Sequence, residues 1–348
     1  MATGAQPAVT VLTLGGTIAS VPDASSEGAK PSLTAEDLVA GVPGLADVAD
    51  VHATSFRQAP SGELTLRDLF ALAAEARRRV EAGAQGVVVT QGTDTLEETA
   101  FALDLLCALD APVVVTGAMR APHLPGADGP ANLLAAVRVA TWPEARGLGC
   151  LVVFNDEIHA ARFVQKTHTS NPATFASALT GPIGWISEDR PRLAARPWPR
   201  PGLPVREDAP PASVPLLTLA LGDDTGLLEH VRDGGYDGLV LEAYGGGHVP
   251  ERFVEPLTEL ATRIPVVLAS RTGSGEILRK TYGFAGGERD LLSRGLIGAG
   301  ALDGLKARLL LAILLTRSAS RDQVTETFAA VGFGGSGREA YGGRRRPA

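Results

Sequence analysis

Short apolar runs recur along the chain, and each is followed by a polar loop and then by an amphipathic segment. The runs are rich in valine and cover residues 9–14, 86–90, 111–116 and 150–154. Continuous apolar runs of this length are typical of strands buried on both faces, and strands that alternate with helices form parallel sheets. We therefore expect an α/β fold whose large N-terminal domain holds a parallel, flavodoxin-like sheet.

Helix start signals lie between the predicted strands. Thr34 and Thr65 each precede an aspartate by three positions, which is the spacing of a capping box. The second signal opens a helix predicted over 65–82, and a further helix is predicted over 96–109. Residues 19–33 are rich in serine, glycine and proline, so we expect a long polar loop there.

A proline-rich segment divides the chain. With 348 residues, the chain is longer than a single core usually supports. The strand and helix pattern stops at residues 191–213, which predict an extended linker, and then restarts. We therefore expect an N-terminal domain over 1–190 and a smaller α/β domain over 214–331. Residues 332–348 are rich in glycine and arginine and are expected to be a disordered tail.

Charge and composition narrow the class of protein. The net charge of -7 and the isoelectric point near 5.5 disfavour binding to nucleic acid or to an anionic membrane surface. No apolar stretch is long enough to cross a bilayer, and the first residues lack the basic patch and apolar run of a secretory signal. We therefore expect a cytoplasmic protein. Cys107 and Cys150 lie in apolar surroundings and are expected to be buried thiols without a disulfide.

Two Gly-Thr turns each close a predicted buried strand. Thr17 follows the first strand, and Thr93 and Asp94 follow the strand at 86–90. The carboxyl ends of parallel strands meet at one edge of a sheet, and ligands bind there. We therefore expect these residues to gather in one crevice with Ala118, which follows the next strand. Such a turn alone is more typical of a plain connection between a strand and a loop, because glycine turns are common.

The residues at this edge suit acyl transfer. A threonine hydroxyl is a weak nucleophile and needs a base, and a lysine in a desolvated crevice holds its proton less tightly. Lys166 is our candidate base, Asp94 would hold this lysine or a substrate ammonium, and backbone N–H groups of the glycine turns would stabilise an oxyanion. Taken singly, Lys166 is more typical of a solvated surface charge and Asp94 of a helix cap, so the prediction depends on their combination.

The two threonine motifs resemble a known family. Residues 15–19 (GGTIA) and 91–99 (QGTDTLEET) resemble the two signature motifs of the bacterial-type L-asparaginase/glutaminase family. The resemblance covers nearly the whole chain. It implies a large N-terminal and a small C-terminal domain, and hydrolysis of the side-chain amide of asparagine, in some members also of glutamine, without metal or cofactor. Further matches follow in the family's order: Gly117-Ala118-Met119-Arg120, Ala127-Asp128-Gly129-Pro130 with Asn132-Leu133, Asn155-Asp156, Lys166-Thr167 and Lys306-Ala307-Arg308.

The resemblance also implies roles by position. Thr17 matches the primary nucleophile, and Thr93, Asp94 and Lys166 match a second catalytic triad. The family builds its sites between two subunits of an intimate dimer, usually within a homotetramer, and a glutamate of the neighbouring subunit closes each site. Asp94 would grip the α-ammonium of the substrate, and Ser61 its α-carboxylate. The substrate-binding residues implied in this way are Ser61, Gly62, Thr93, Asp94, Ala118, through its backbone carbonyl, His248 and Glu288.

Three positions depart from the family pattern. Residues 19–33 contain no tyrosine, although members usually carry one there, oriented to the nucleophile; Tyr282 or Tyr244 is the candidate replacement. His248 stands where many members have an asparagine, and an exposed loop histidine without a role is an equal alternative. Gly62 stands where a glutamine is common, which changes the room at the carboxylate end.

We therefore expect an asparaginase that releases L-aspartate and ammonia through a threonine acyl-enzyme. A dual glutaminase-asparaginase is an alternative, because one methylene is worth only about 1–3 kcal/mol of discrimination. A non-catalytic amino-acid sensor would keep Asp94 and Ser61, but the intact Thr17, Thr93 and Lys166 disfavour it. An amidase subunit that supplies ammonia to a partner is a third alternative, although such subunits often carry an extra N-terminal domain.

Overall fold

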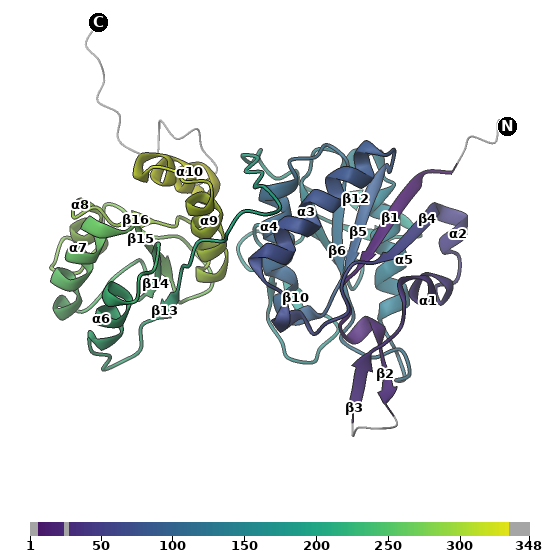
Figure 1. Ribbon diagram of the computed structural model, residues 1–348, viewed down its shortest axis with the longest axis horizontal. Helices are drawn as coiled ribbons and strands as arrows, with labels where there is room; N and C mark the ends of the chain where they lie inside the picture. Colours follow the sequence, from purple (N-terminus) through teal and green to yellow (C-terminus); the bar gives the residue numbers. More distant parts are fainter. Residues whose placement is uncertain (1–5, 24–27, 334–348) are drawn as a thin grey trace, which may run out of the picture. The chain divides into compact units, whose positions relative to one another are not determined.

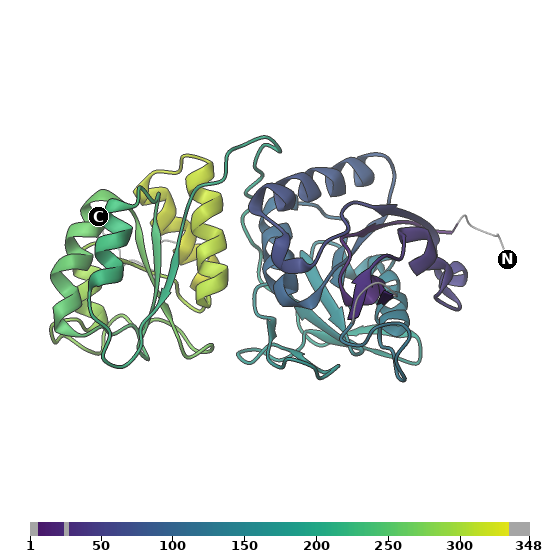
Figure 2. The same ribbon diagram turned by 60° about the horizontal axis from the view of Figure 1, so that its bottom comes forward.

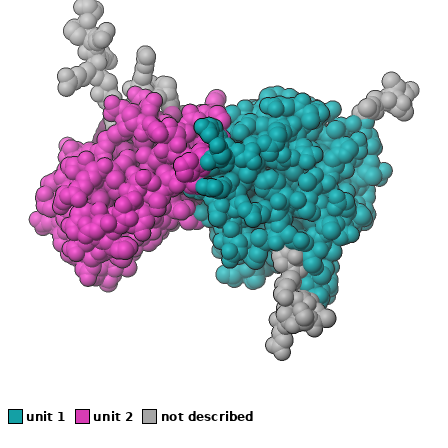
Figure 3. Space-filling view, in the orientation of Figure 1, with its two compact units in different colours: residues 1–198, 206–208 teal, residues 199–205, 209–348 magenta. Residues whose placement is uncertain are grey.

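A computed structural model of the chain describes residues 6–23 and 28–333, which form two compact units (Figures 1 and 3). Unit 1 comprises residues 1–198 and 206–208, and unit 2 comprises residues 199–205 and 209–348. The chain therefore changes units within the predicted linker. The first residues of that linker belong to a strand of unit 1, β12.

Unit 1 is built on an eight-stranded sheet in the order β12-β11-β8-β7-β6-β5-β1-β4. The five strands from β7 to β4 run parallel, and the remaining three are antiparallel to their neighbours. The expected α/β class with a mainly parallel sheet is confirmed. The strands are β1 (Ala8–Thr13), β4 (Asp50–Ser55), β5 (Gly86–Thr90), β6 (Val113–Thr116), β7 (Cys150–Phe154), β8 (Glu157–Ala160), β11 (Gly184–Ser187) and β12 (Arg190–Leu193).

The antiparallel extension follows from the turn residues. Asn155 and Asp156 both have positive φ, 50° and 63°, so the two residues after β7 reverse the chain into β8. Such left-handed pairs form the tight hairpin turns that match strand twist, and asparagine and aspartate tolerate this conformation. Glu188 and Asp189, with φ of 48° and 65°, do the same between β11 and β12.

Helices cover both faces of this sheet (Figure 1). The helices α3 and α4 contact one another and the central strands, while α5 packs on the opposite face with the short helix α2. Both predicted capping boxes are confirmed, since Thr34 and Thr65 each cap a helix. The helices are α1 (Ala35–Ala40), α2 (Leu45–Val48), α3 (Leu66–Glu81), α4 (Leu96–Cys107) and α5 (Gly129–Ala140).

The expectation of a long polar loop over residues 19–33 was wrong for most of its described residues, which form two short strands. A short 3-10 helix, η1 (Thr17–Ala19), leads into β2 (Ser20–Asp23), which pairs antiparallel with β3 (Gly28–Pro31). The segment lacks the alternation of apolar and polar residues that is typical of a half-buried strand, so its strands could not be predicted from periodicity.

Unit 2 holds a four-stranded parallel sheet in the order β13-β14-β15-β16, which confirms the expected smaller α/β unit. The helices α6 and α7 cover one face and α9 the other (Figure 2). The last helix, α10, includes Gly332 and Phe333, which we expected in the tail; residues 334–348 lie outside the described part. The elements are β13 (Leu216–Thr218), α6 (Gly226–Asp233), β14 (Leu239–Ala243), α7 (Val254–Arg263), β15 (Val266–Ser270), α8 (Glu288–Ser293), β16 (Ile297–Gly298), α9 (Gly304–Thr316) and α10 (Arg321–Phe333).

Two further expectations concern the whole chain. Cys107 and Cys150 are both buried, and no disulfide joins them. Within residues 6–23 and 28–333, every helix is too short or too polar to cross a lipid bilayer.

Candidate functional site

The two Gly-Thr turns pack back to back at the carboxyl edge of the large sheet. Strands β1 and β5 are parallel neighbours, so the turns that follow them lie side by side. Gly16 has a φ of +86°, and a Cβ at this position would lie 2.1 Å from the backbone nitrogen of Gly92. Only glycine therefore permits this contact, which brings the segments of Thr17 and Thr93 together.

A third segment, which begins with Ser61, packs against the same turn. Ser61 is buried at the start of the 3-10 helix η2 (Ser61–Glu63), and a Cβ at Gly92 would lie 2.9 Å from its hydroxyl oxygen. The Thr95 hydroxyl donates a hydrogen bond of 2.9 Å to the Ser61 carbonyl. Gly62 is exposed, with open space where a side chain would stand.

Lys166 connects Thr93 to Asp94. Its ammonium donates to Thr93 Oγ1 at 2.9 Å and to Asp94 Oδ1 at 2.6 Å. The lysine side chain is 16% exposed and the aspartate side chain 80%, so the pair reaches from the protein interior to solvent. The backbone N–H of Lys166 donates to Glu97 Oε1 at 3.1 Å, which ties this residue to the start of α4. The three residues can thus exchange a proton along short hydrogen bonds.

Lys166 lies on a short strand pair that a buried histidine anchors to the large sheet. Strand β9 (Gln165–Lys166) pairs with β10 (Phe175–Ala176), and Lys166 stands opposite Phe175. Ser177, which follows β10, shares a hydrogen bond of 3.0 Å with Nδ1 of the fully buried His159 on β8. Burial lowers the pKa of His159 to about 4. The Glu157 carboxylate, 3.2 Å from Nε2, is half exposed, so solvent screens it.

Two side chains hold the loop around Ala118 on both sides. The Asp128 carboxylate accepts the backbone N–H groups of Met119, at 2.9 Å, and of Arg120, at 2.8 Å. Asn132 Nδ2 donates to the Gly117 carbonyl at 3.0 Å. The backbone of the buried Ala118 is therefore fixed from its preceding and its following peptide. The sequence showed Asp128 and Asn132 only as matches to the family pattern, because a backbone-binding role leaves no signal in composition or spacing.

His248 and Glu288 lie together in unit 2. Glu288 is fully buried, and its Oε1 accepts the backbone N–H groups of Thr281, at 2.7 Å, and Tyr282, at 2.8 Å. Its Oε2 lies 3.3 Å from His248 Nε2. Burial alone raises the pKa of Glu288, but the Tyr282 and Thr281 N–H groups and His248 outweigh it, so this pKa lies below its ordinary value.

Aromatic rings flank His248. The Tyr282 ring meets the imidazole edge-on, with centroids 4.8 Å apart, and the Phe284 ring does so at 5.4 Å. The histidine side chain is 23% exposed, so it is not the exposed loop residue of the alternative interpretation. Both aromatic residues are themselves exposed. The hydroxyl of Tyr244, the other candidate tyrosine, donates to the Ala220 carbonyl within the same unit.

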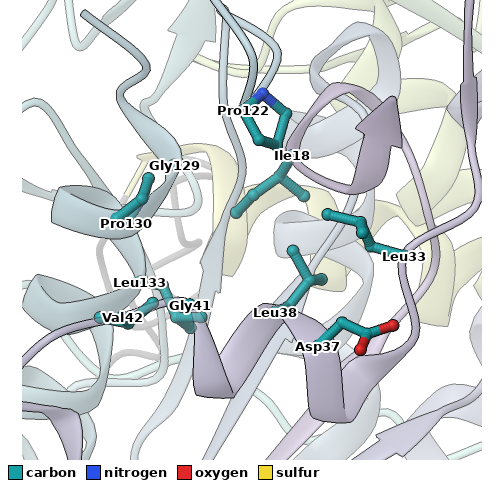
Figure 4. A pocket seen from close by; sticks show the side chains of 10 residues that line it. All are labelled: Ile18, Leu33, Asp37, Leu38, Gly41, Val42, Pro122, Gly129, Pro130 and Leu133. Carbon is teal, nitrogen blue, oxygen red and sulfur yellow. The ribbon is translucent and has the colours of Figure 1, made fainter. Parts of the chain in front are cut away.

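A small cavity lies beside the first threonine turn. Its volume is about 80 Å³, and Figure 4 shows Ile18, Leu33 and Leu38 around it. The lining is almost wholly apolar, with the exposed Asp37 at its edge. An amino-acid substrate carries two charged groups that need polar partners, so this cavity does not suit one. In the described residues, no cluster of His, Cys, Asp and Glu side chains is arranged to hold a metal ion.

Comparisons with known proteins identify the family. Residues 8–199 match the model of the asparaginase N-terminal domain, and residues 213–328 match that of the glutaminase/asparaginase C-terminal domain. The chain belongs to the bacterial-type L-asparaginase family. It is accordingly an amidohydrolase, as the sequence predicted.

Individual members of the family align over most of the chain. A probable L-asparaginase from Deinococcus radiodurans is 40% identical over 92% of this chain and 97% of its own length. L-asparaginase 2 from Escherichia coli is 33% identical, and the match covers 93% of each. The crystal structure of a probable cytoplasmic L-asparaginase from Campylobacter jejuni superposes with a TM-score of 0.82 at 29% identity, over 93% of this chain and 99% of that one.

Proposed function

We propose that the chain hydrolyses the side-chain amide of L-asparagine to L-aspartate and ammonia through an ester on Thr17. The observation that carries the proposal is the hydrogen-bonded group of Thr93, Lys166 and Asp94 beside a second threonine turn. Within the described residues, the Thr17 hydroxyl makes no hydrogen bond, whereas the Thr93 hydroxyl is engaged by Lys166. Thr17 is therefore the hydroxyl that is available for attack.

The reaction proceeds in two halves. Thr17 Oγ1 attacks the amide carbon, the C–N bond breaks, and ammonia leaves with the proton from the hydroxyl. Water then adds to the ester, the bond to Oγ1 breaks, and Thr17 regains a proton. Thr93 relays protons between the reacting groups and Lys166, which serves as the general base. Backbone N–H groups of the glycine turns stabilise the oxyanion in both halves.

The charged ends of the substrate set its orientation. Lys166 engages Oδ1 of Asp94, and the exposed carboxylate presents its other oxygen to the α-ammonium. Ser61 binds the α-carboxylate next to the open position at Gly62, and the Ala118 carbonyl faces the amide. We propose asparagine as the main substrate. Glutamine is the alternative, because one methylene changes the free energy of binding by about 1–3 kcal/mol.

We also propose that His248 and Glu288 complete the site of a neighbouring subunit in an intimate dimer, within a cytoplasmic homodimer or homotetramer. The protein of the Campylobacter structure is described as cytoplasmic, whereas a Haemophilus influenzae relative, 30% identical, is described as periplasmic. Coexpression of Thr17→Val and Glu288→Ala subunits tests the shared site, because mixed dimers then contain one intact site. Confirmed mixed dimers without restored activity would refute it.

Ammonia release from asparagine and glutamine, measured side by side, tests the reaction itself. We expect Thr17→Val and Thr93→Val to abolish turnover while substrate binding falls only modestly. Thr327→Val, at a half-buried position of α10 where the hydroxyl donates to the Gln323 carbonyl of the same helix, is the matched control and should behave like wild type. A wild-type protein that binds asparagine without releasing ammonia would instead be a sensor. Turnover near wild type in Thr93→Val would show that the triad is assigned wrongly.

Components of glutamyl-tRNA(Gln) amidotransferases also align with this chain. The component from Methanosarcina barkeri is 32% identical over 86% of this chain, and the match covers 70% of that longer protein. An amidase that supplies ammonia to a partner would favour glutamine. A clear preference for asparagine in the same assay would therefore exclude this role.

A further inference from the structure

A groove on unit 1 concentrates positive charge in a chain whose net charge is -7. It lies along strands β11 and β12 and the residues after α5, and its volume is about 640 Å³. The side chains that characterise it are indoles and guanidinium groups, with one carboxylate: Trp142, Trp185, Arg190, Arg192, Arg196 and Glu144. None of these residues belongs to the threonine site.

The three arginines of the groove are not neutralised. In the part of the chain that the structure describes, the side chains of Arg190, Arg192 and Arg196 make no ion pair or hydrogen bond. The nearby Arg138, in contrast, pairs with Asp189 at 2.8 Å. Glu144 is the single carboxylate among the lining residues, so two positive charges remain in excess. Guanidinium groups match the geometry of phosphate oxygens and bind them with paired hydrogen bonds.

The two indoles supply a second kind of contact. Trp185 is 46% exposed and stands opposite Arg192 in the β11–β12 register, so the ring and the guanidinium project from the same face of the sheet. Trp142, which follows α5, is half-buried and also lines the groove. Flat aromatic ligands stack on such rings, and the volume of the groove is that of a small-molecule site.

We propose that this groove binds a nucleoside polyphosphate, with the guanidinium groups on the phosphates and the indoles against the base. Protection of the edge strand β12 against strand pairing would also account for Arg190 and for Pro191 beside it, because charges and prolines block such pairing. It does not account for Trp185, since an exposed indole next to a sheet edge favours association. The combination of unpaired cations and an exposed indole fits an aromatic polyanion.

Titration of the full chain with ATP, adenosine and inorganic triphosphate tests the proposal. Two of the three tryptophans line the groove, so their fluorescence reports binding, and calorimetry confirms it. We expect ATP to bind more tightly than triphosphate, and adenosine weakly. The double variant Arg190→Gln/Arg192→Gln should weaken ATP binding at least about tenfold. Glu144→Gln should strengthen it by removing a repulsive charge.

Two controls separate the contributions. Arg67→Gln removes an exposed arginine elsewhere on unit 1 and should leave ATP binding unchanged. Trp185→Leu should weaken the binding of ATP but not that of triphosphate. The proposal is overturned if ATP does not saturate, or if the double variant binds it normally. Equal affinity for ATP and triphosphate would show that the groove binds anions without recognising a base, which contradicts the proposal. Binding of polyglutamate but not of ATP would contradict it as well, and would indicate that the groove binds an acidic protein.

Discussion

The carboxylate of Asp128 should be essential for turnover although it does not touch the substrate. In Asp128→Ala, the backbone N–H groups of Met119 and Arg120 lose their acceptor. Hydrogen bonds to charged groups contribute about 1.5–3 kcal/mol each. Arg120 is exposed, so water can take the place of the carboxylate as acceptor for its N–H group. We therefore expect the free energy of unfolding to fall by about 2–3 kcal/mol. A displacement of the Ala118 carbonyl by about 1 Å should lower kcat about a hundredfold.

The assay measures kcat and KM for asparagine together with urea unfolding. Asp128→Asn keeps one acceptor oxygen and turns an amide group toward the remaining donor, so its kcat should lie between those of Asp128→Ala and wild type. Asp110→Asn is the matched control: this exposed carboxylate pairs with Arg146 on the same unit, and its loss should leave kcat unchanged. If Asp128→Ala loses the expected stability but keeps kcat within about twofold of wild type, the positioning argument is wrong.

Three further predictions concern the titratable groups of the two units. Lys166→Met removes the amine beside Thr93 and should lower kcat by about 10²–10⁴-fold, measured as ammonia release, with the protein still folded by circular dichroism. Glu288→Gln keeps an acceptor for the two backbone N–H groups but loses the charge facing His248, so KM for asparagine should rise more than kcat falls; an unchanged KM would contradict its role. His159 titrates at about 4 when folded and near 6.5 when unfolded, so the unfolded state binds more protons between these values and stability should fall by about 3 kcal/mol as the pH drops from 6.5 to 4. In urea unfolding, His159→Gln should not show this fall in stability between pH 6.5 and pH 4. An identical pH dependence in the variant and in wild type would show that His159 does not cause it.

The central strands could be predicted from the sequence because a strand that is buried on both faces appears as a continuous apolar run. Strands β5, β6 and β7 are continuous valine-rich runs, and every one of their residues is buried. The antiparallel strands β8, β11 and β12 were missed. They are four residues long, β12 contains arginine and proline, and their pairing depends on two left-handed turns rather than on an apolar pattern. Strands β2 and β3 were also missed, because each is four residues long and contains a proline.

The candidate site could be predicted only in part from the residues themselves. The two Gly-Thr turns were recognisable because each follows a buried strand, and parallel strands bring their ends together. Lys166 and Thr93 are 73 positions apart in the sequence. Lys166 is placed by the pair of strands β9 and β10, which are too short to show a periodic pattern. Lys166 was therefore proposed as a base from its chemistry alone, and the family resemblance added its place in a triad with Thr93 and Asp94. The role of Asp128 was not predicted at all, because hydrogen bonds to a backbone depend on loop geometry.

The pair of His248 and Glu288 shows how an unusual residue changes the chemistry that a family pattern leads one to expect. An asparagine at position 248 would offer a neutral amide, whereas a histidine offers a titratable ring. Glu288 already binds two backbone N–H groups through one oxygen, and its other oxygen faces the imidazole at 3.3 Å. A fully buried carboxylate costs free energy unless it is paired, and the two N–H groups and the imidazole edge are the polar partners that Glu288 has here. Unit 2 therefore carries a histidine in contact with the carboxylate of the proposed site, so a substitution at position 248 changes the surroundings of Glu288. His248→Asn should consequently change KM for asparagine more than kcat, and a KM equal to that of wild type would contradict a role for this contact.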